Sequence, residues 1–143
     1  MSVLKYQSDC NNIPWVQVPL LLEKVGMSFT DVEKHKISFE NSYAVVFVFD
    51  GLVLIGMGRI LSDGVRQSSV YDIAVDPLYQ GKRIGQSIMQ HLMAATPDCN
   101  FILYASPGKE SFYRKIGFKK MKTGMAYFAC PDRMTDGVFV EDE

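Results

Sequence analysis

A β-hairpin in the middle of the chain constrains the fold most strongly. The run 43–49 is β-branched and aromatic, Asp50 and Gly51 follow it, and a second apolar run, 52–60, comes directly afterwards. Asp-Gly supplies the positive backbone angles of a tight turn, so the two runs are expected to pair as antiparallel strands. The hairpin commits this part of the chain to a sheet.

The segments around the hairpin alternate between strand and helix patterns. Strands are predicted at 3–6, 69–75, 101–105 and 125–129, and helices at 14–26, 30–36, 84–93 and 109–116. Pro19 argues for a kink in the first helix, because an interior proline interrupts the hydrogen-bond ladder. Thr30 and Glu33 have the spacing of a capping box for the second helix. Strands that alternate with helices after a hairpin favour a mixed α/β (α+β) fold with helices on both faces.

Length and charge fit one compact domain over residues 1–143, with a frayed acidic end at 141–143. Fifteen basic and 16 acidic side chains give a net charge of -1. That balance lacks the broad positive field that nucleic-acid binders use, so no nucleic-acid partner is expected. No apolar run approaches the ~20 residues that cross a bilayer, and residues 1–5 lack a signal-peptide pattern. We therefore expect a soluble, cytoplasmic protein with no membrane partner.

The three cysteines do not form a recognisable pattern. Cys10, Cys99 and Cys130 are far apart in the sequence, and His35 and His91 are its only histidines. Neither a disulfide framework nor a zinc site is expected, so the predicted metal content is none.

A strand-to-helix junction holds the first residues that suggest chemistry. After Val75-Asp76-Pro77, the chain reads Gln80-Gly81-Lys82-Arg83-Ile84-Gly85. Such a loop directs backbone N–H groups and the positive end of a helix dipole at one place, which attracts phosphate. The Walker pattern fails because Arg83 follows Gly-Lys, and the dinucleotide pattern fails because only two glycines are present. An ordinary strand–helix turn with exposed basic side chains explains the same residues equally well.

A second stretch lies later in the chain, at Phe112-Tyr113-Arg114-Lys115-Ile116-Gly117-Phe118. In this order the two stretches resemble the GCN5-related N-acetyltransferase (GNAT) family. Its acetyl-coenzyme A motif reads Gln/Arg-x-x-Gly-x-Gly/Ala and its later motif reads Phe-Tyr-x-x-x-Gly-Phe. The resemblance covers residues 43–128. It implies a central, mostly antiparallel mixed sheet, splayed at the middle strands, with helices on both faces.

The resemblance also implies roles for individual residues, with acetyl-coenzyme A as the acetyl donor. Ile73 and Val75 would bind the pantetheine arm through their backbone, and Ser106 would donate a hydrogen bond to the cofactor. Tyr113 would be the general acid that protonates the departing thiolate; the alternative is a core tyrosine. The pyrophosphate would be held by Gln80, Gly81, Lys82, Arg83, Ile84, Gly85 and Gln86.

Two positions depart from the family pattern. Arg83 stands where the family has the first glycine of Gly-x-Gly, and a positive φ there would cost about 1 kcal/mol, which contact with phosphate could offset. Lys109 stands where the family often has alanine, and either reaches a phosphate or is solvated.

The general base is the least defined element. Asp72 is the candidate nearest to the expected reaction centre, because a carboxylate inside a strand is either paired or faces an open cleft. The alternative for Asp72 is a strand-face residue bonded to nearby backbone. Glu33 and Glu40 are more distant candidates, and ordered water is another route for the proton.

These residues predict transfer of an acetyl group to a primary amine of a small molecule by direct, sequential attack. A covalent acetyl-enzyme is disfavoured because neither motif contains a cysteine with a histidine base nearby. Alternative hypotheses are a protein or peptide acetyltransferase that acts on lysine or the N-terminus, and a non-catalytic coenzyme A-binding interaction module. An unrelated α/β domain with an anion-binding loop is a further alternative. Exposed strand edges would allow a homodimer.

Overall fold

The computed structural model describes residues 3–129 and 139–140. The chain separates into two compact units, which meet at the Leu103–Tyr104 bond. The single domain expected over residues 1–143 stays a prediction. The frayed acidic end expected at 141–143 lies outside the described residues.

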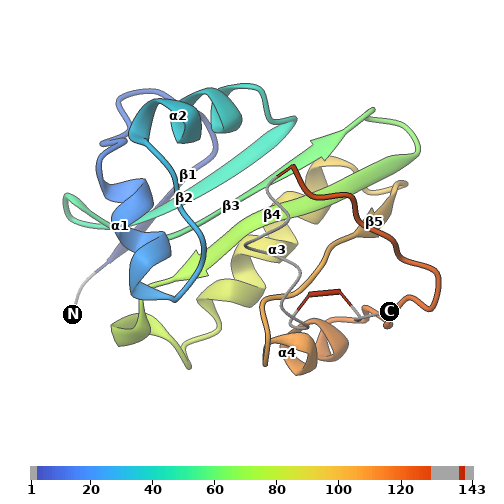
Figure 1. Cartoon of the computed structure of the whole chain (residues 1–143). Helices are drawn as coiled ribbons and strands as arrows, with labels where there is room; N and C mark the ends of the chain where they lie inside the picture. The colour runs from blue at the N-terminus through green and yellow to red at the C-terminus, as the bar shows by residue number, and fades with distance from the viewer. Residues whose placement is uncertain (1–2, 130–138, 141–143) are drawn as a thin grey trace. The chain divides into compact units, whose positions relative to one another are not determined.

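The first unit contains a five-stranded sheet in the order β1-β2-β3-β4-β5. The strands from β1 to β4 pair antiparallel, and β5 pairs parallel with β4 (Figure 1). The predicted hairpin is confirmed, with β2 turning through Gly51 at φ +60° into β3. The mostly antiparallel mixed sheet is therefore also confirmed. The strands are β1 (Leu4–Gln7), β2 (Ala44–Asp50), β3 (Val53–Ser62), β4 (Gln67–Val75) and β5 (Asn100–Ile102).

The sheet opens between β4 and β5. Their register runs from Gln67↔Asn100 to Ser69↔Ile102, and β5 then ends while β4 continues to Val75. This confirms the splay that the family resemblance implied. The strand predicted at 101–105 is thus shorter at its end than the apolar run suggested.

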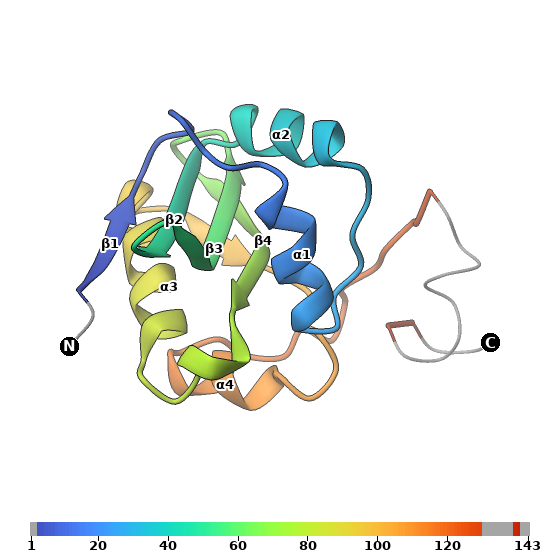
Figure 2. The same cartoon turned by 90° about the vertical axis from the view of Figure 1, so that its left-hand side faces the viewer.

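Helices cover both faces of the sheet, as expected. Figure 2 shows α1 (Gln17–Lys24) and α2 (Val32–Glu40) on one face and α3 (Ile84–Ala95) on the other. Each sheet-facing helix surface is apolar, since burial of such side chains is the main force that holds the layers together. The fully or almost fully buried helix residues are Val18, Leu21, Leu22, Phe39, Ile88, Met89 and Leu92.

Two glycines in β3 make room for α3. A Cβ at Gly58 would lie 2.4 Å from Ile73 Cδ1, 2.9 Å from Ile88 Cγ2 and 3.0 Å from Leu92 Cδ1. A Cβ at Gly56 would lie 3.2 Å from Ile88 Cδ1. The absence of side chains here lets the helix approach the sheet closely, which positions the N-terminus of α3 relative to β4.

The starts of α1 and α2 differ from the sequence predictions. Pro19 does not interrupt α1, because it lies in the first turn, where N–H groups have no acceptor within the helix. The predicted capping box is wrong: Asp31, not Thr30, caps α2, and its side chain accepts a 3.0 Å hydrogen bond from the Lys34 N–H. The Thr30 N–H instead donates to Nε2 of His35 at 2.9 Å.

The second unit contains α4 (Glu110–Lys115), within the predicted helix 109–116. Gly117 follows it at φ +103°, as expected for a residue that ends a helix. The strand predicted at 125–129 is wrong, because these residues adopt no strand. Met125 and Tyr127 are 98% and 100% exposed, so the apolar pattern there does not mark a buried face.

Candidate functional site

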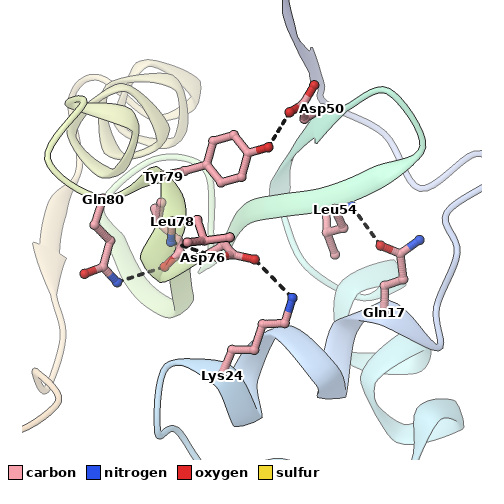
Figure 3. Close-up of polar contacts among 9 residues, drawn as sticks. Gln17, Lys24, Asp50, Leu54, Asp76, Leu78, Tyr79 and Gln80 are labelled. Carbon is pink, nitrogen blue, oxygen red and sulfur yellow. Dashed lines mark hydrogen bonds and ion pairs between the residues drawn. The ribbon is translucent and has the colours of Figure 1, made fainter. Parts of the chain in front are cut away.

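The loop from β4 to α3 closes tightly on the end of its own strand. The chain passes through the single-turn 3₁₀ helix η1 (Pro77–Tyr79) and then through Gln80, whose Nε2 donates a 2.9 Å hydrogen bond to the carbonyl of Val75 (Figure 3). Gly81 has φ +81°, a left-handed conformation that favours glycine. The loop thereby brings the start of α3 back beside the end of β4.

The N-terminus of α3 presents backbone donors. Arg83 is the N-cap residue, with φ 62° and ψ 21°, and its side chain makes no capping hydrogen bond. The first hydrogen bond of the helical ladder runs from the Ser87 N–H to the Arg83 carbonyl at 3.1 Å. The N–H groups of Ile84, Gly85 and Gln86 precede that bond, so the helix itself supplies them no acceptor. Together with the helix dipole they suit an anion.

Arg83, which stands where the family has glycine, adopts a left-handed backbone conformation. A positive φ at Arg83 was the condition for backbone strain at this position, and the φ of Arg83 is 62°. The Lys82 side chain lies over the ring of Tyr79, with Nζ 5.5 Å from the ring centroid. Gly81, Lys82 and Arg83 are all exposed, so both positive charges are accessible to a ligand at this loop.

The end of β4 bonds to β3 on one side. The Asp76 N–H donates to the Ile55 carbonyl in β3 at 2.7 Å. Because successive N–H groups along a strand point in opposite directions, that of Val75 points away from β3. This direction is the one in which β4 has parted from β5. Ile73 lies just before this point, and its side chain packs towards Gly58 and α3.

Asp72 lies in a bulge of β4. The register with β3 passes from Met57↔Ala74 to Arg59↔Tyr71, so Asp72 and Ile73 together oppose one residue of β3. Asp72 has φ +59°, and this irregularity changes the direction of its side chain.

The Asp72 carboxylate forms an ion pair with Arg59, at 2.7 Å between Oδ2 and Nε. Both side chains are largely buried, and the Arg59 guanidinium lies 5.7 Å from the Phe39 ring and 5.1 Å from the Tyr71 ring. Arg59 was not predicted from the sequence as the partner of Asp72. The sequence signal for this partner was Arg59 itself, the one charged residue in the apolar run 52–60.

His35 lies in the same part of the first unit. It is buried, and burial lowers the pKa of its imidazole, while the Asp72 charge opposes that shift and the Arg59 charge adds to it. Because Nε2 accepts a hydrogen bond from the Thr30 N–H, the ring is held in its neutral form. The imidazole therefore stabilises the start of α2 by accepting this hydrogen bond.

The second unit holds Tyr113 in an aromatic setting. Its ring meets that of Phe112 at a centroid distance of 4.9 Å and that of Phe118 at 5.8 Å, both edge to face. Burial raises the pKa of the Tyr113 phenol to about 12, so the side chain keeps its proton at neutral pH. The Ser106 carbonyl accepts a 2.9 Å hydrogen bond from the Lys109 N–H, and the Lys109 side chain is exposed.

Comparisons with known proteins identify the family. The acetyltransferase (GNAT) domain family matches residues 21–126. An uncharacterised ycf52-like N-acetyltransferase of Prochlorococcus marinus is 30% identical over 118 residues, covering 78% of this chain and 66% of that protein. Histone acetyltransferase TAP1 of Glycine max is 29% identical over 119 residues, covering 73% of this chain and 52% of that protein. The chain thus spans between about half and two thirds of the length of these two relatives.

A solved structure agrees with the sequence relatives. A probable acetyltransferase from meticillin-resistant Staphylococcus aureus has a TM-score of 0.78 and 30% identity, covering 88% of this chain and 98% of that chain. This chain therefore belongs to the GNAT family of N-acetyltransferases. The fold and family predicted from the sequence are both confirmed.

Within residues 3–129 and 139–140, no three His, Cys, Asp or Glu side chains gather closely enough to hold a metal ion. In the same part of the chain, every helix is too short or too polar to cross a bilayer.

Proposed function

We propose that this protein transfers the acetyl group of acetyl-coenzyme A to the primary amine of a small molecule. The N-terminus of α3 carries the proposal, because its first-turn N–H groups have no side-chain cap and adjoin the exposed Lys82 and Arg83. A pyrophosphate is the anion that such a loop suits, and the GNAT family generally takes acetyl-coenzyme A.

Each predicted binding residue keeps its proposed role. The N–H groups of Arg83 and of the three residues after it bind the pyrophosphate, with Gly81 giving close backbone access and Lys82 adding charge. Gln80 acts by bonding the Val75 carbonyl, and thus shapes the loop. Ile73 and Val75 offer backbone groups to the pantetheine arm. Ser106 keeps its predicted role as a hydrogen-bond donor to the cofactor.

Acetyl-coenzyme A supplies an activated thioester. In direct attack the amine nitrogen forms a bond to the acetyl carbon, the carbon–sulfur bond breaks, and the amine loses a proton. The Asp72 carboxylate is the proposed acceptor of that proton, directly or through water. Tyr113 is the proposed donor of a proton to the sulfur, and a pKa of about 12 keeps its phenol protonated for this task.

A thiol-release assay with acetyl-coenzyme A and a panel of amines tests this proposal. Tyr113→Phe is expected to lower kcat about 100-fold, the order of a lost general acid, while the calorimetric Kd for coenzyme A stays unchanged. Tyr127→Phe, at a fully exposed tyrosine of the same unit, is the matched control and should retain wild-type turnover.

The outcomes separate the alternatives. Failure of the wild-type protein to bind coenzyme A would contradict the proposed donor. Binding without turnover on any amine would favour the non-catalytic interaction module. Unchanged kcat in Tyr113→Phe would remove the tyrosine from the mechanism while leaving the transferase assignment intact.

A protein acetyltransferase is the second candidate, favoured by the similarity to a soybean protein named as a histone acetyltransferase. Against it, a net charge of -1 provides no strong overall attraction for basic protein tails. Histone-tail peptides belong in the amine panel, and a kcat/KM for them above that of every small amine would reverse the order of the two candidates.

Cytoplasmic location and a homodimer also stay proposals. The strand β1 is the first in the sheet order, and its edge is the surface that a partner strand would extend. Sedimentation equilibrium over a range of protein concentrations tests the dimer.

A further inference from the structure

The start of the loop between β4 and α3 is held by Asp76, which is only 4% exposed. Its N–H donates to the Ile55 carbonyl at 2.7 Å, and its own carbonyl accepts the Tyr79 N–H at 2.8 Å. Its Oδ1 accepts the Leu78 N–H at 3.0 Å, and its Oδ2 accepts from Lys24 Nζ at 3.1 Å. Every polar group of this residue is thus used to fix the direction in which the chain leaves β4.

The Lys24 contact comes from outside the loop. Lys24 lies in the last turn of α1, far from Asp76 in sequence, and its side chain is 56% exposed against 6% for that of Asp76. Burial alone would raise the pKa of Asp76, but the Leu78 N–H and the Lys24 ammonium outweigh it and hold that pKa below its ordinary value. The loop therefore starts from a charged, nearly buried carboxylate that depends on a cation supplied by α1.

A second contact holds the far end of η1. The Tyr79 hydroxyl donates a hydrogen bond to Asp50 Oδ2, at the end of β2 and beside the hairpin turn. The same Tyr79 ring carries Lys82 Nζ over its face at 5.5 Å. Figure 3 shows the Lys24–Asp76 and Tyr79–Asp50 contacts, with Lys24 reaching Asp76 from one side and Tyr79 reaching Asp50 from the other.

We propose that Lys24 and Asp50 are positioning residues for coenzyme A binding, which hold the 76–80 segment in place through Asp76 and Tyr79. This inference rests on the proposed function, since it concerns the loop that would hold the pyrophosphate. Neither residue lies in the loop or belongs to the predicted binding set. Both act on the segment immediately before the N–H groups of α3.

The physical reason is pre-organisation. A ligand that binds backbone N–H groups must order the loop that carries them unless the protein has ordered it already. Here the two contacts fix both ends of η1, and the bond from Gln80 to the Val75 carbonyl fixes the residue after it. Loss of either outer contact should reduce the affinity for coenzyme A, although the protein groups that bind the pyrophosphate are unchanged.

Two substitutions remove one contact each with little change in shape. Lys24→Met keeps most of the side-chain length and removes the ammonium, and Tyr79→Phe keeps the ring beneath Lys82 and removes the hydroxyl. Each is expected to raise the calorimetric Kd for coenzyme A, and the KM for acetyl-coenzyme A, about three- to tenfold. We expect kcat at saturating acetyl-coenzyme A to change less than twofold.

The controls separate positioning from general stability. Gln17 also ties α1 to the sheet, accepting the Leu54 N–H at 2.8 Å and donating to the Leu52 carbonyl at 3.1 Å, without touching the loop. Gln17→Met should therefore lower the Tm and leave the Kd for coenzyme A unchanged. Lys24→Arg, which keeps the positive charge, should restore most of the affinity lost in Lys24→Met.

The results discriminate between the possible failures. If wild-type protein binds coenzyme A and both Lys24→Met and Tyr79→Phe bind it equally well, the inference is wrong. An equal rise in Kd in Gln17→Met would also overturn it, because the effect would then follow the stability of α1. If wild-type protein binds no coenzyme A, the proposed function fails instead.

Discussion

The loop at residues 76–86 and the segment 112–118 both carry family motifs, but different forces hold them. In the loop, the hydrogen bond that Tyr79 donates to the Asp50 carboxylate raises the pKa of its phenol. In the later segment, burial alone raises that of Tyr113. One tyrosine donates to a charged group from a distant strand, and the other is surrounded by rings from its own segment.

This difference shows how each motif obtains its geometry. The loop presents backbone N–H groups, and their direction depends on α3, β3 and the side chains that fix η1. The later segment presents one side chain, whose ring contacts those of Phe112 and Phe118. Substitutions far from the loop should therefore change the direction of its N–H groups. The pKa of Tyr113 should respond mainly to substitutions of its neighbours in sequence.

The largest effect is expected from crowding the contact between α3 and β3. Gly58→Ala places a Cβ 2.4 Å from Ile73 Cδ1, so the helix or the side chains must shift, at about 1–3 kcal/mol of unfolding free energy. Urea denaturation measures the loss, and coenzyme A affinity should fall with it. Gly124→Ala, whose Cβ would lie 3.7 Å from Met121 Cβ in ordinary contact, is the control in the other unit and should be nearly neutral.

A smaller effect is expected from the partly buried phenol of Tyr113 at high pH. Its pKa of about 12 in the folded chain exceeds the ordinary value near 10, so the unfolded chain loses this proton first. The protonated phenol therefore contributes stability that is fully present below pH 10 and is lost as the pH rises through 12. The loss is about 1 kcal/mol at pH 11. The difference in unfolding free energy between wild type and Tyr113→Phe should shift by this amount from pH 9 to 11.

Exposed Tyr127 provides the comparison for that measurement. Tyr127→Phe should leave the pH dependence of unfolding as in the wild type, because the hydroxyl is equally solvated in both states. If Tyr113→Phe and Tyr127→Phe gave identical pH profiles, burial would not be the cause of the raised pKa of Tyr113.

The smallest effect is expected from relieving strain at the N-cap of α3. Arg83 has φ 62°, and glycine adopts this conformation without the Cβ conflict. Arg83→Gly should stabilise the fold by less than about 1 kcal/mol, since the added freedom of the unfolded chain offsets part of the gain. Gly81→Ala, at φ +81°, should change stability in the opposite direction. A loss of stability in Arg83→Gly would mean that the arginine side chain outweighs the strain.

Patterns of short range predicted the fold well. The β-branched and aromatic runs and the Asp-Gly turn predicted β2 and β3, and the 3.6-residue spacing from Ile84 predicted α3. The apolar run at 125–129 was misleading, because a strand needs neighbours as well as propensity. The loop and Tyr113 motifs were recognisable because several side chains of restricted type recur at fixed spacing.

The sequence by itself determined the family, the order of most elements, and the glycine-containing loop at the start of α3. Only the tertiary structure decided which side chains support that loop. Lys24 meets Asp76 and Asp50 meets Tyr79, each pair joining the loop to a separate element, and in the sheet Arg59 of β3 likewise meets Asp72 of β4. Propensity and periodicity act over a few residues, whereas an ion pair between distant segments forms only after the sheet and helices have packed. The residues that position the loop are therefore visible only in the folded protein.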